Sequence, residues 1–300
     1  MTYAGAYINL DRCPGRRAEI EGELARHGLA GRYRRFGAAD GNTLALPASR
    51  LNHGEIGCFT SHYLLLKEHL ALDRHLHVVE DDTVFASCFD QVVSRIIDSG
   101  AMDALDILYT DVALPLSNEA YKNFKALYDK IVTRDAAGKL KNAAFQILKP
   151  DNLMFLTANA YLVNKRSIGR IHQIFHDELM RGAQLPVDAL LREKIMAGKI
   201  TAGCIFPFIT SVRPERVMNS LVRKVPDVTL KFTAATIARY SFFIDASWDE
   251  CEDMIERLLP PPSQDDRHAA ILSQILAFSL MNGEELNEDP ALKKAAAGKI

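Results

Sequence analysis

The chain has 300 residues, of which 48% are hydrophobic and 25% are charged, so it can bury one large core or two smaller ones. Lysine plus arginine (36) nearly balance aspartate plus glutamate (38), and the formal net charge is -2. This composition excludes wholesale disorder, and the charge provides no general attraction to nucleic acid. We therefore expect a globular protein that does not bind DNA or RNA.

The cysteines and the apolar runs indicate where the protein works. Five scattered cysteines lack the CxxC spacing of a zinc or redox site, and we interpret them as reduced core thiols. The first apolar run is interrupted by Asp11 and Arg12 and is too short for a secretory signal. No stretch reaches the roughly 20 apolar residues of a membrane span. The sequence therefore predicts a cytoplasmic protein without a transmembrane segment, with at most peripheral contact at the inner membrane.

The first hundred residues alternate short apolar runs with amphipathic segments, which is typical of a parallel sheet with crossover helices. The predicted strands span residues 4–10, 33–38, 75–80 and 107–109. The predicted helices span residues 14–27, 55–70 and 89–97. Pro14 favours the start of the first helix and Gly28 its end. The predicted fold class is α/β, with a mostly parallel central sheet flanked by helices.

Later segments are predicted to differ in character. The Lys-rich region 114–150 has weak periodicity, and we interpret it as an insertion or mobile flap beside the site. Two further strands, 157–163 and 200–206, and two helices, 165–180 and 187–197, are predicted to follow. Beyond residue 224 the segments are helical and are divided by three consecutive prolines. We therefore divide the chain into a main domain, 1–224, and a helical C-terminal appendage, 225–300, the predicted surface for homo-oligomer formation.

Several well-known motifs are absent from the chain. There is no GxGxxG after the first strand, and no GxxxxGK[ST], GxSxG or HExxH. We interpret none of the nine histidines as metal ligands. Carboxylates are then the expected hard ligands, and the sequence favours carboxylate chemistry.

An acidic run, Glu80-Asp81-Asp82, stands where an apolar strand is predicted to end. In open α/β sheets the carboxyl ends of strands form the ligand crevice. Three adjacent carboxylates repel one another unless they are solvated or balanced by a cation, and oxygen ligands suit Mn²⁺ or Mg²⁺. Such an ion could hold a pyrophosphate. The alternative interpretation is a solvated strand end that caps the next helix.

Three polar residues, Glu55, Ser61 and His62, lie on the helix before that strand and could line the same crevice. The alternative interpretation is that these residues only stabilise the fold and bind no ligand.

A second set of polar residues lies at predicted helix starts. Asp188 opens a helix, where the dipole keeps its carboxylate ionised, and it could act as a base. Arg16 and Arg17 could reach a phosphate. Ordinary surface roles at helix starts are the alternative for all three.

The combination of these motifs, in this order, resembles glycosyltransferase family 25, the group of lipooligosaccharide and collagen galactosyltransferases. The resemblance covers roughly residues 3–220. It rests on the segments 7–10, 54–58, 78–82, 157–163 and 186–188, together with Arg16-Arg17 and Ser61-His62.

This resemblance implies a GT-A type fold for residues 1–224 and a UDP-sugar donor, usually UDP-galactose or UDP-glucose. It implies transfer of the hexose with inversion to a saccharide or glycolipid acceptor. Asp81 and Asp82 would hold Mn²⁺ or Mg²⁺, and Asp188 is the expected general base. The expected donor-binding residues are Asn9, Leu10, Arg16, Arg17, Glu55, Ser61, His62, Glu80, Asn159, Asn219 and Ser220.

The chain departs from the family pattern at three places. Leu66 replaces a frequent tryptophan, Ala160 replaces the glycine of a Gly-Tyr pair, and the segment 213–220 lacks a histidine. The leading hypothesis is a hexosyltransferase of lipopolysaccharide or surface-glycan biosynthesis. One alternative is a catalytically degenerate member that binds nucleotide sugar or a partner protein without turnover. Another is a metal-dependent phosphoryl or nucleotidyl enzyme.

Overall fold

The computed structural model describes residues 2–44, 46, 49–114, 118–135, 138–149, 157–213, 215 and 226–258. Among these residues, seven strands form a central sheet in the order β2-β1-β3-β9-β5-β10-β8. These strands are β1 (Tyr3–Asn9), β2 (Tyr33–Gly37), β3 (His75–Glu80), β5 (Ile107–Tyr109), β8 (Gln146–Leu148), β9 (Ala160–Val163) and β10 (Ala202–Phe206). β8 and β9 run antiparallel to their neighbours, and the other five run in one direction. The predicted α/β class with a mostly parallel sheet is therefore confirmed.

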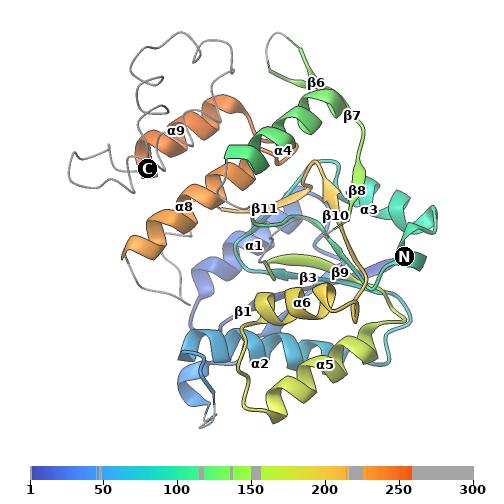
Figure 1. Cartoon of the computed structure of the whole chain (residues 1–300), viewed down its shortest axis with the longest axis vertical. Coiled ribbons are helices and arrows are strands. Elements are labelled where there is room, and N and C mark those ends of the chain that lie inside the picture. Colours follow the sequence, from blue (N-terminus) through green and yellow to red (C-terminus); the bar gives the residue numbers. More distant parts are fainter. Residues whose placement is uncertain are drawn as a thin grey trace.

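Helices cover both faces of this sheet (Figure 1). On one side, α2 (His53–Glu68) packs against α5 (Ile168–Met180) and α6 (Val187–Met196). On the other side lie α1 (Pro14–Arg26) and α3 (Phe89–Asp98). The end of β3 therefore has α1 on one side and α2 on the other.

The predicted elements of the sheet and its flanking helices are confirmed, with bounds shifted by at most three residues. Pro14 begins α1, and Gly28, with φ of 68°, follows its end. In α2 the predicted apolar stripe is buried at Ile56, Phe59 and Leu66. Leu70 lies beyond the helix and is exposed. Apolar periodicity thus predicted these helices and strands correctly, but it placed some of their first or last residues up to three positions away.

The described part of region 114–150, which the sequence analysis interpreted as an insertion or mobile flap, contains regular elements that the sequence analysis did not predict. The elements there are α4 (Asn118–Ile131), β6 (Val132–Arg134), β7 (Leu140–Ala143) and β8. One face of α4 carries Tyr121, Phe124 and Tyr128, all buried, and each ring contacts Phe242. Because aromatic side chains bury a large area, this stripe anchors α4 on the core.

The described C-terminal residues form two helices, α8 (Pro226–Tyr240) and α9 (Trp248–Leu258). Ile237, Phe242 and Ile244 are buried in the same hydrophobic core as the sheet. These helices are therefore continuous with the main core. The three prolines at 260–262 lie outside the described residues, and a boundary at residue 224 and self-association through this region stay predictions.

A small two-stranded sheet lies at the carboxyl end of β3, where β4 (Thr83–Phe85) pairs with β11 (Thr210–Val212). The remaining short elements are η1 (Gly41–Thr43) and η2 (Ala101–Ala104). In the part of the chain that the structure describes, no helix has both the length and the apolar character of a membrane span.

Two glycines allow η1 to pack directly on α2. A Cβ on Gly41 would lie 1.6 Å from the carbonyl oxygen of His53, and one on Gly57 would lie 2.8 Å from that of Ala39. Both clashes are with backbone, which cannot move aside as a flexible side chain can. This contact fixes the loop between β2 and α2, and with it the start of the helix that carries His62.

We predict that Gly41→Ala lowers the free energy of unfolding by about 3 kcal/mol, because the added methyl group has no space. The matched control is Gly22→Ala in α1, where a Cβ meets nothing within 4 Å. That change should stabilise the protein by up to about 1 kcal/mol, since alanine is the better helix former. Urea unfolding of both variants measures the difference. Equal stability of the two variants would show that η1 does not pack on α2 in this way.

Candidate active site

Two carboxylates of the acidic run contact one arginine at the carboxyl end of β3. Arg16, in the first turn of α1, places its Nε atom 2.8 Å from Asp81 Oδ1 and its Nη2 atom 2.7 Å from Asp82 Oδ2. All three side chains are at most 15% exposed. A protein cation therefore offsets part of the repulsion expected among adjacent carboxylates.

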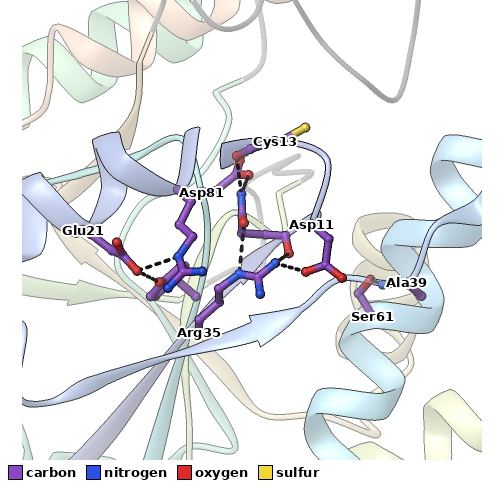
Figure 2. A network of polar contacts seen from close by, with 10 residues as sticks. Asp11, Cys13, Glu21, Arg35, Ala39, Ser61 and Asp81 are labelled. Atoms are coloured by element: carbon purple, nitrogen blue, oxygen red, sulfur yellow. Dashed lines mark hydrogen bonds and ion pairs between the residues drawn. The ribbon is translucent and has the colours of Figure 1, made fainter. Parts of the chain in front are cut away.

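Asn9 ties the ends of β1 and β3 together. Its amide donates to Asp81 Oδ2 at 2.7 Å and to the carbonyl oxygen of Cys13 at 3.2 Å. The guanidinium of Arg35 donates to the side-chain oxygen of Asn9 at 3.1 Å and pairs with Asp11 (Figure 2). These contacts fix the position of Asp81.

One oxygen of Asp82 has no such partner. Its Oδ1 atom is buried without a hydrogen bond. Burial raises the pKa of Asp82 to about 7, and the charges of Glu80 and Asp81 add to this effect while Arg16 opposes it. A divalent cation would stabilise the ionised form strongly at this place. The unpartnered oxygen of Asp82 therefore fits one ligand of the Mn²⁺ or Mg²⁺ that the sequence predicts at Asp81 and Asp82.

Glu80 faces the opposite side of the sheet, toward α2. Its Oε1 atom lies 3.7 Å from Cys58 Sγ and 3.7 Å from His62 Nε2, and the other ring nitrogen of His62 lies 2.8 Å from the hydroxyl of Tyr161. Burial would raise the pKa of Glu80, but His62 and Arg16 outweigh it, so the pKa is lowered. Glu80 is therefore ionised at neutral pH.

Asn159 lies beside the acidic run, as predicted. Its carbonyl oxygen accepts the backbone N–H of Glu80 at 2.9 Å, and its side-chain oxygen accepts the hydroxyl of Thr83 at 3.3 Å. The Nδ2 atom is buried without a hydrogen-bond partner. That amide lies close enough to Asp111 to lower the pKa of its carboxyl group.

Asp188, in the first turn of α6, lies on the α2 side of the sheet. Its Oδ1 atom accepts the N–H of Ala189 at 2.8 Å. Burial raises the pKa of Cys58 and of Tyr109, and the nearby negative charge of Asp188 raises both further. The structure thus brings Asp188 into the neighbourhood of the Glu80 cluster.

Four predicted donor-binding residues make local contacts that stabilise the fold. Arg17 pairs with Glu21, and the carboxylate of Glu55 completes a capping box at the start of α2. The hydroxyl of Ser61 accepts the N–H of Ala39 at 2.9 Å (Figure 2). The carbonyl oxygen of Leu10 accepts the N–H of Cys13 at the turn into α1. Donor binding by these four stays a prediction, and Asn219 and Ser220 lie outside the described residues.

Two residues that the sequence analysis missed, Asp111 and Arg239, meet beside the run. Asp111 lies two residues after β5 and is fully buried, and its Oδ2 atom is 3.5 Å from Arg239 Nη1 of α8. Neither Asp111 oxygen has a hydrogen-bond partner, and neither has Arg239 Nε. Burial raises the pKa of Asp111, opposed by Arg239. Asp111 follows an apolar strand, as Glu80 does, so the same rule could have found it.

A surface hollow lies at the opposite end of the strands, where β1 and β3 begin. Its lining includes Asp73, Arg74 and Lys165. Ligands of open α/β sheets bind at the carboxyl ends of the strands. The buried unpartnered atoms of Asp82, Asp111 and Asn159 gather at that end. We therefore assign the candidate site to the carboxyl end.

The comparison with curated proteins gave no match. A family model, glycosyltransferase family 25 (LPS biosynthesis protein), matches residues 6–191. The matched range contains the acidic run, Arg16 and Asp188, and it ends before α8. Because the match covers more than half of the chain and includes the site at the end of β3, the chain belongs to glycosyltransferase family 25.

Proposed function

We propose that the protein is an inverting hexosyltransferase that uses a UDP-sugar and transfers galactose or glucose to a saccharide or glycolipid acceptor. Family membership implies glycosyl transfer and places it in lipopolysaccharide biosynthesis. The observation that carries the proposal is the unpaired, buried oxygen of Asp82 beside Arg16. In a metal-bound diphosphate, the metal would balance the negative charge of Asp82 and the phosphate oxygens would balance the positive charge of Arg16.

The donor diphosphate would be held by groups of both signs. Asp81 and Asp82 would hold Mn²⁺ or Mg²⁺, which neutralises charge on the departing diphosphate when it is bound. Arg16 lies at the same strand ends, and Arg239 is close enough to lower the pKa of Asp82. The amide of Asn159, which is buried beside Asp111, would donate to an oxygen of the donor. These fixed charges stabilise developing negative charge without reorganisation.

Inversion requires a base on the side of the sugar opposite the leaving group. Arg16 approaches the acidic run from α1, whereas Asp188 belongs to α6 on the other side of the sheet. The base would take the proton of the acceptor hydroxyl as that oxygen forms the new glycosidic bond and the diphosphate departs. Asp188 lies near Cys58 and Tyr109, beside the Glu80 end of the acidic run, and this placement supports it in this role.

We predict that UDP and one UDP-hexose raise the melting temperature more than GDP, CMP or ADP counterparts, and that Mn²⁺ enlarges the shift. A specific ligand of the native state stabilises it by mass action. Thermal-shift screening with each nucleotide, with and without Mn²⁺, measures this. Preference for nucleoside triphosphates would favour a phosphoryl or nucleotidyl enzyme. UDP-hexose binding without donor hydrolysis or transfer would indicate a degenerate member.

We predict that Asp82→Asn weakens Mn²⁺-dependent UDP binding at least about tenfold, because it removes a charged metal ligand. Metal-free UDP binding should stay nearly unchanged. Calorimetry with and without EDTA measures both, with Asp98→Asn, an exposed residue at the end of α3, as the control. UDP affinity that is independent of Mn²⁺ in the unaltered protein would remove the metal and leave Arg16 and Arg239 to bind the diphosphate.

We predict that Asp188→Asn lowers turnover on the order of a hundredfold while donor affinity is retained, because it removes the general base. Glu193→Gln, an exposed change on the same helix, is the control and should keep normal turnover. Steady-state kinetics together with UDP calorimetry separate the two effects. Near-normal turnover of a folded Asp188→Asn protein would rule out this base.

A further inference from the structure

A cluster of three different ligand types lies between α2 and the end of β3. Cys58 and His62 are four residues apart, so they share one face of α2. Both face Glu80, at 3.7 Å from Oε1 to the sulfur and 3.7 Å to Nε2 of the imidazole. The three ligand atoms all lie within 4.8 Å of one another. Thiol, imidazole and carboxylate are therefore assembled by two elements that the core holds rigidly.

The imidazole of His62 is not satisfied by its protein neighbours. The side chain is 1% exposed, and its Nε2 atom is buried without a hydrogen-bond partner. Nδ1 is occupied by the hydroxyl of Tyr161 at 2.8 Å. The distance from Nε2 to Glu80 is too long for a hydrogen bond in either tautomer. A cation between the nitrogen and the carboxylate would satisfy both groups.

The donor set selects the kind of cation. Zn²⁺ takes sulfur at about 2.3 Å and nitrogen or oxygen at about 2.0–2.1 Å in tetrahedral geometry, which separates its ligand atoms by roughly 3.3–3.6 Å. The two distances of 3.7 Å are close to this spacing. Thiolate and imidazole suit Zn²⁺ and Co²⁺, whereas Mn²⁺ and Mg²⁺ prefer oxygen. The hydrogen bond from His62 to Tyr161 is of the kind that orients metal-bound imidazoles.

We propose that Cys58, His62 and Glu80 form a binding site for Zn²⁺ or a similar soft divalent ion, with a fourth position open to solvent. Binding forms a bond from the metal to the sulfur, and the thiol proton leaves to solvent without any redox change. The partly exposed Glu80 side chain provides access from solvent. The site is separate from the oxygen-ligand site at Asp81 and Asp82, and it does not depend on the proposed transferase activity.

Co²⁺ provides the test, because a cobalt–thiolate bond absorbs in the near ultraviolet and tetrahedral Co²⁺ absorbs in the visible range. The full chain, freed of metal with EDTA, should develop both absorptions on titration with Co²⁺. Zn²⁺ should abolish them by displacement, and excess Mn²⁺ should not. Cys58→Ser should remove the thiolate absorption and weaken Co²⁺ binding at least about tenfold. Cys88→Ser, at the start of α3, should change neither.

Two further variants make the result decisive. Asp82→Asn should leave the cobalt spectrum unchanged, because the proposed ligands exclude Asp82. His62→Gln should weaken Co²⁺ binding while the thiolate absorption persists at saturation. Circular dichroism checks that each variant is folded. The cobalt absorption of the unaltered chain tests the proposal even if one variant does not fold. Absence of a thiolate absorption in the unaltered chain, or its retention in Cys58→Ser, would overturn the proposal.

Discussion

The pairing of Arg16 with Asp81 and Asp82 is the interaction on which the site depends. Three consecutive carboxylates at the end of a buried strand would repel one another and would be costly to desolvate. The guanidinium from the first turn of α1 contacts two of them, and the amide of Asn9 fixes Asp81. The ends of β1, β3 and α1 are therefore held together by charge as well as by packing. The Oδ1 atom of Asp82 has no hydrogen-bond partner in the protein, so it can contact a ligand.

The acidic run serves two sides of the sheet because Glu80 is the last residue of β3, whereas Asp81 and Asp82 lie in the turn that follows it. Glu80 turns toward Cys58 and His62 of α2, whereas Asp81 and Asp82 meet Arg16 of α1. The same three carboxylates thus lie in two chemical environments, one with sulfur and imidazole and one with oxygen and guanidinium. The two proposed metal sites would therefore separate a soft ion from a hard ion over three consecutive residues.

Most of the sheet and its flanking helices could be predicted from apolar periodicity, because their buried faces repeat regularly. The region 114–150 could not, since Lys122, Lys125 and Lys130 obscure the aromatic stripe of α4. At the site, the rule about strand ends found the acidic run and could have found Asp111. The contacts of Ser61 and Glu55 stabilise a loop and a helix start, and donor binding by these two residues stays a prediction. No local pattern marks Arg239, which reaches the site only through the packing of α8.

Arg239 also bears on where the functional unit ends. A buried ion pair stabilises a protein only when good geometry and further hydrogen bonds repay the desolvation of both charges. The pair with Asp111 meets neither condition, since the atoms are 3.5 Å apart and three nearby polar atoms lack partners. Optimised packing would favour apolar residues at both positions. Stability alone therefore gives little reason for this pair, and through it α8, which lies beyond the family match, packs beside the acidic run.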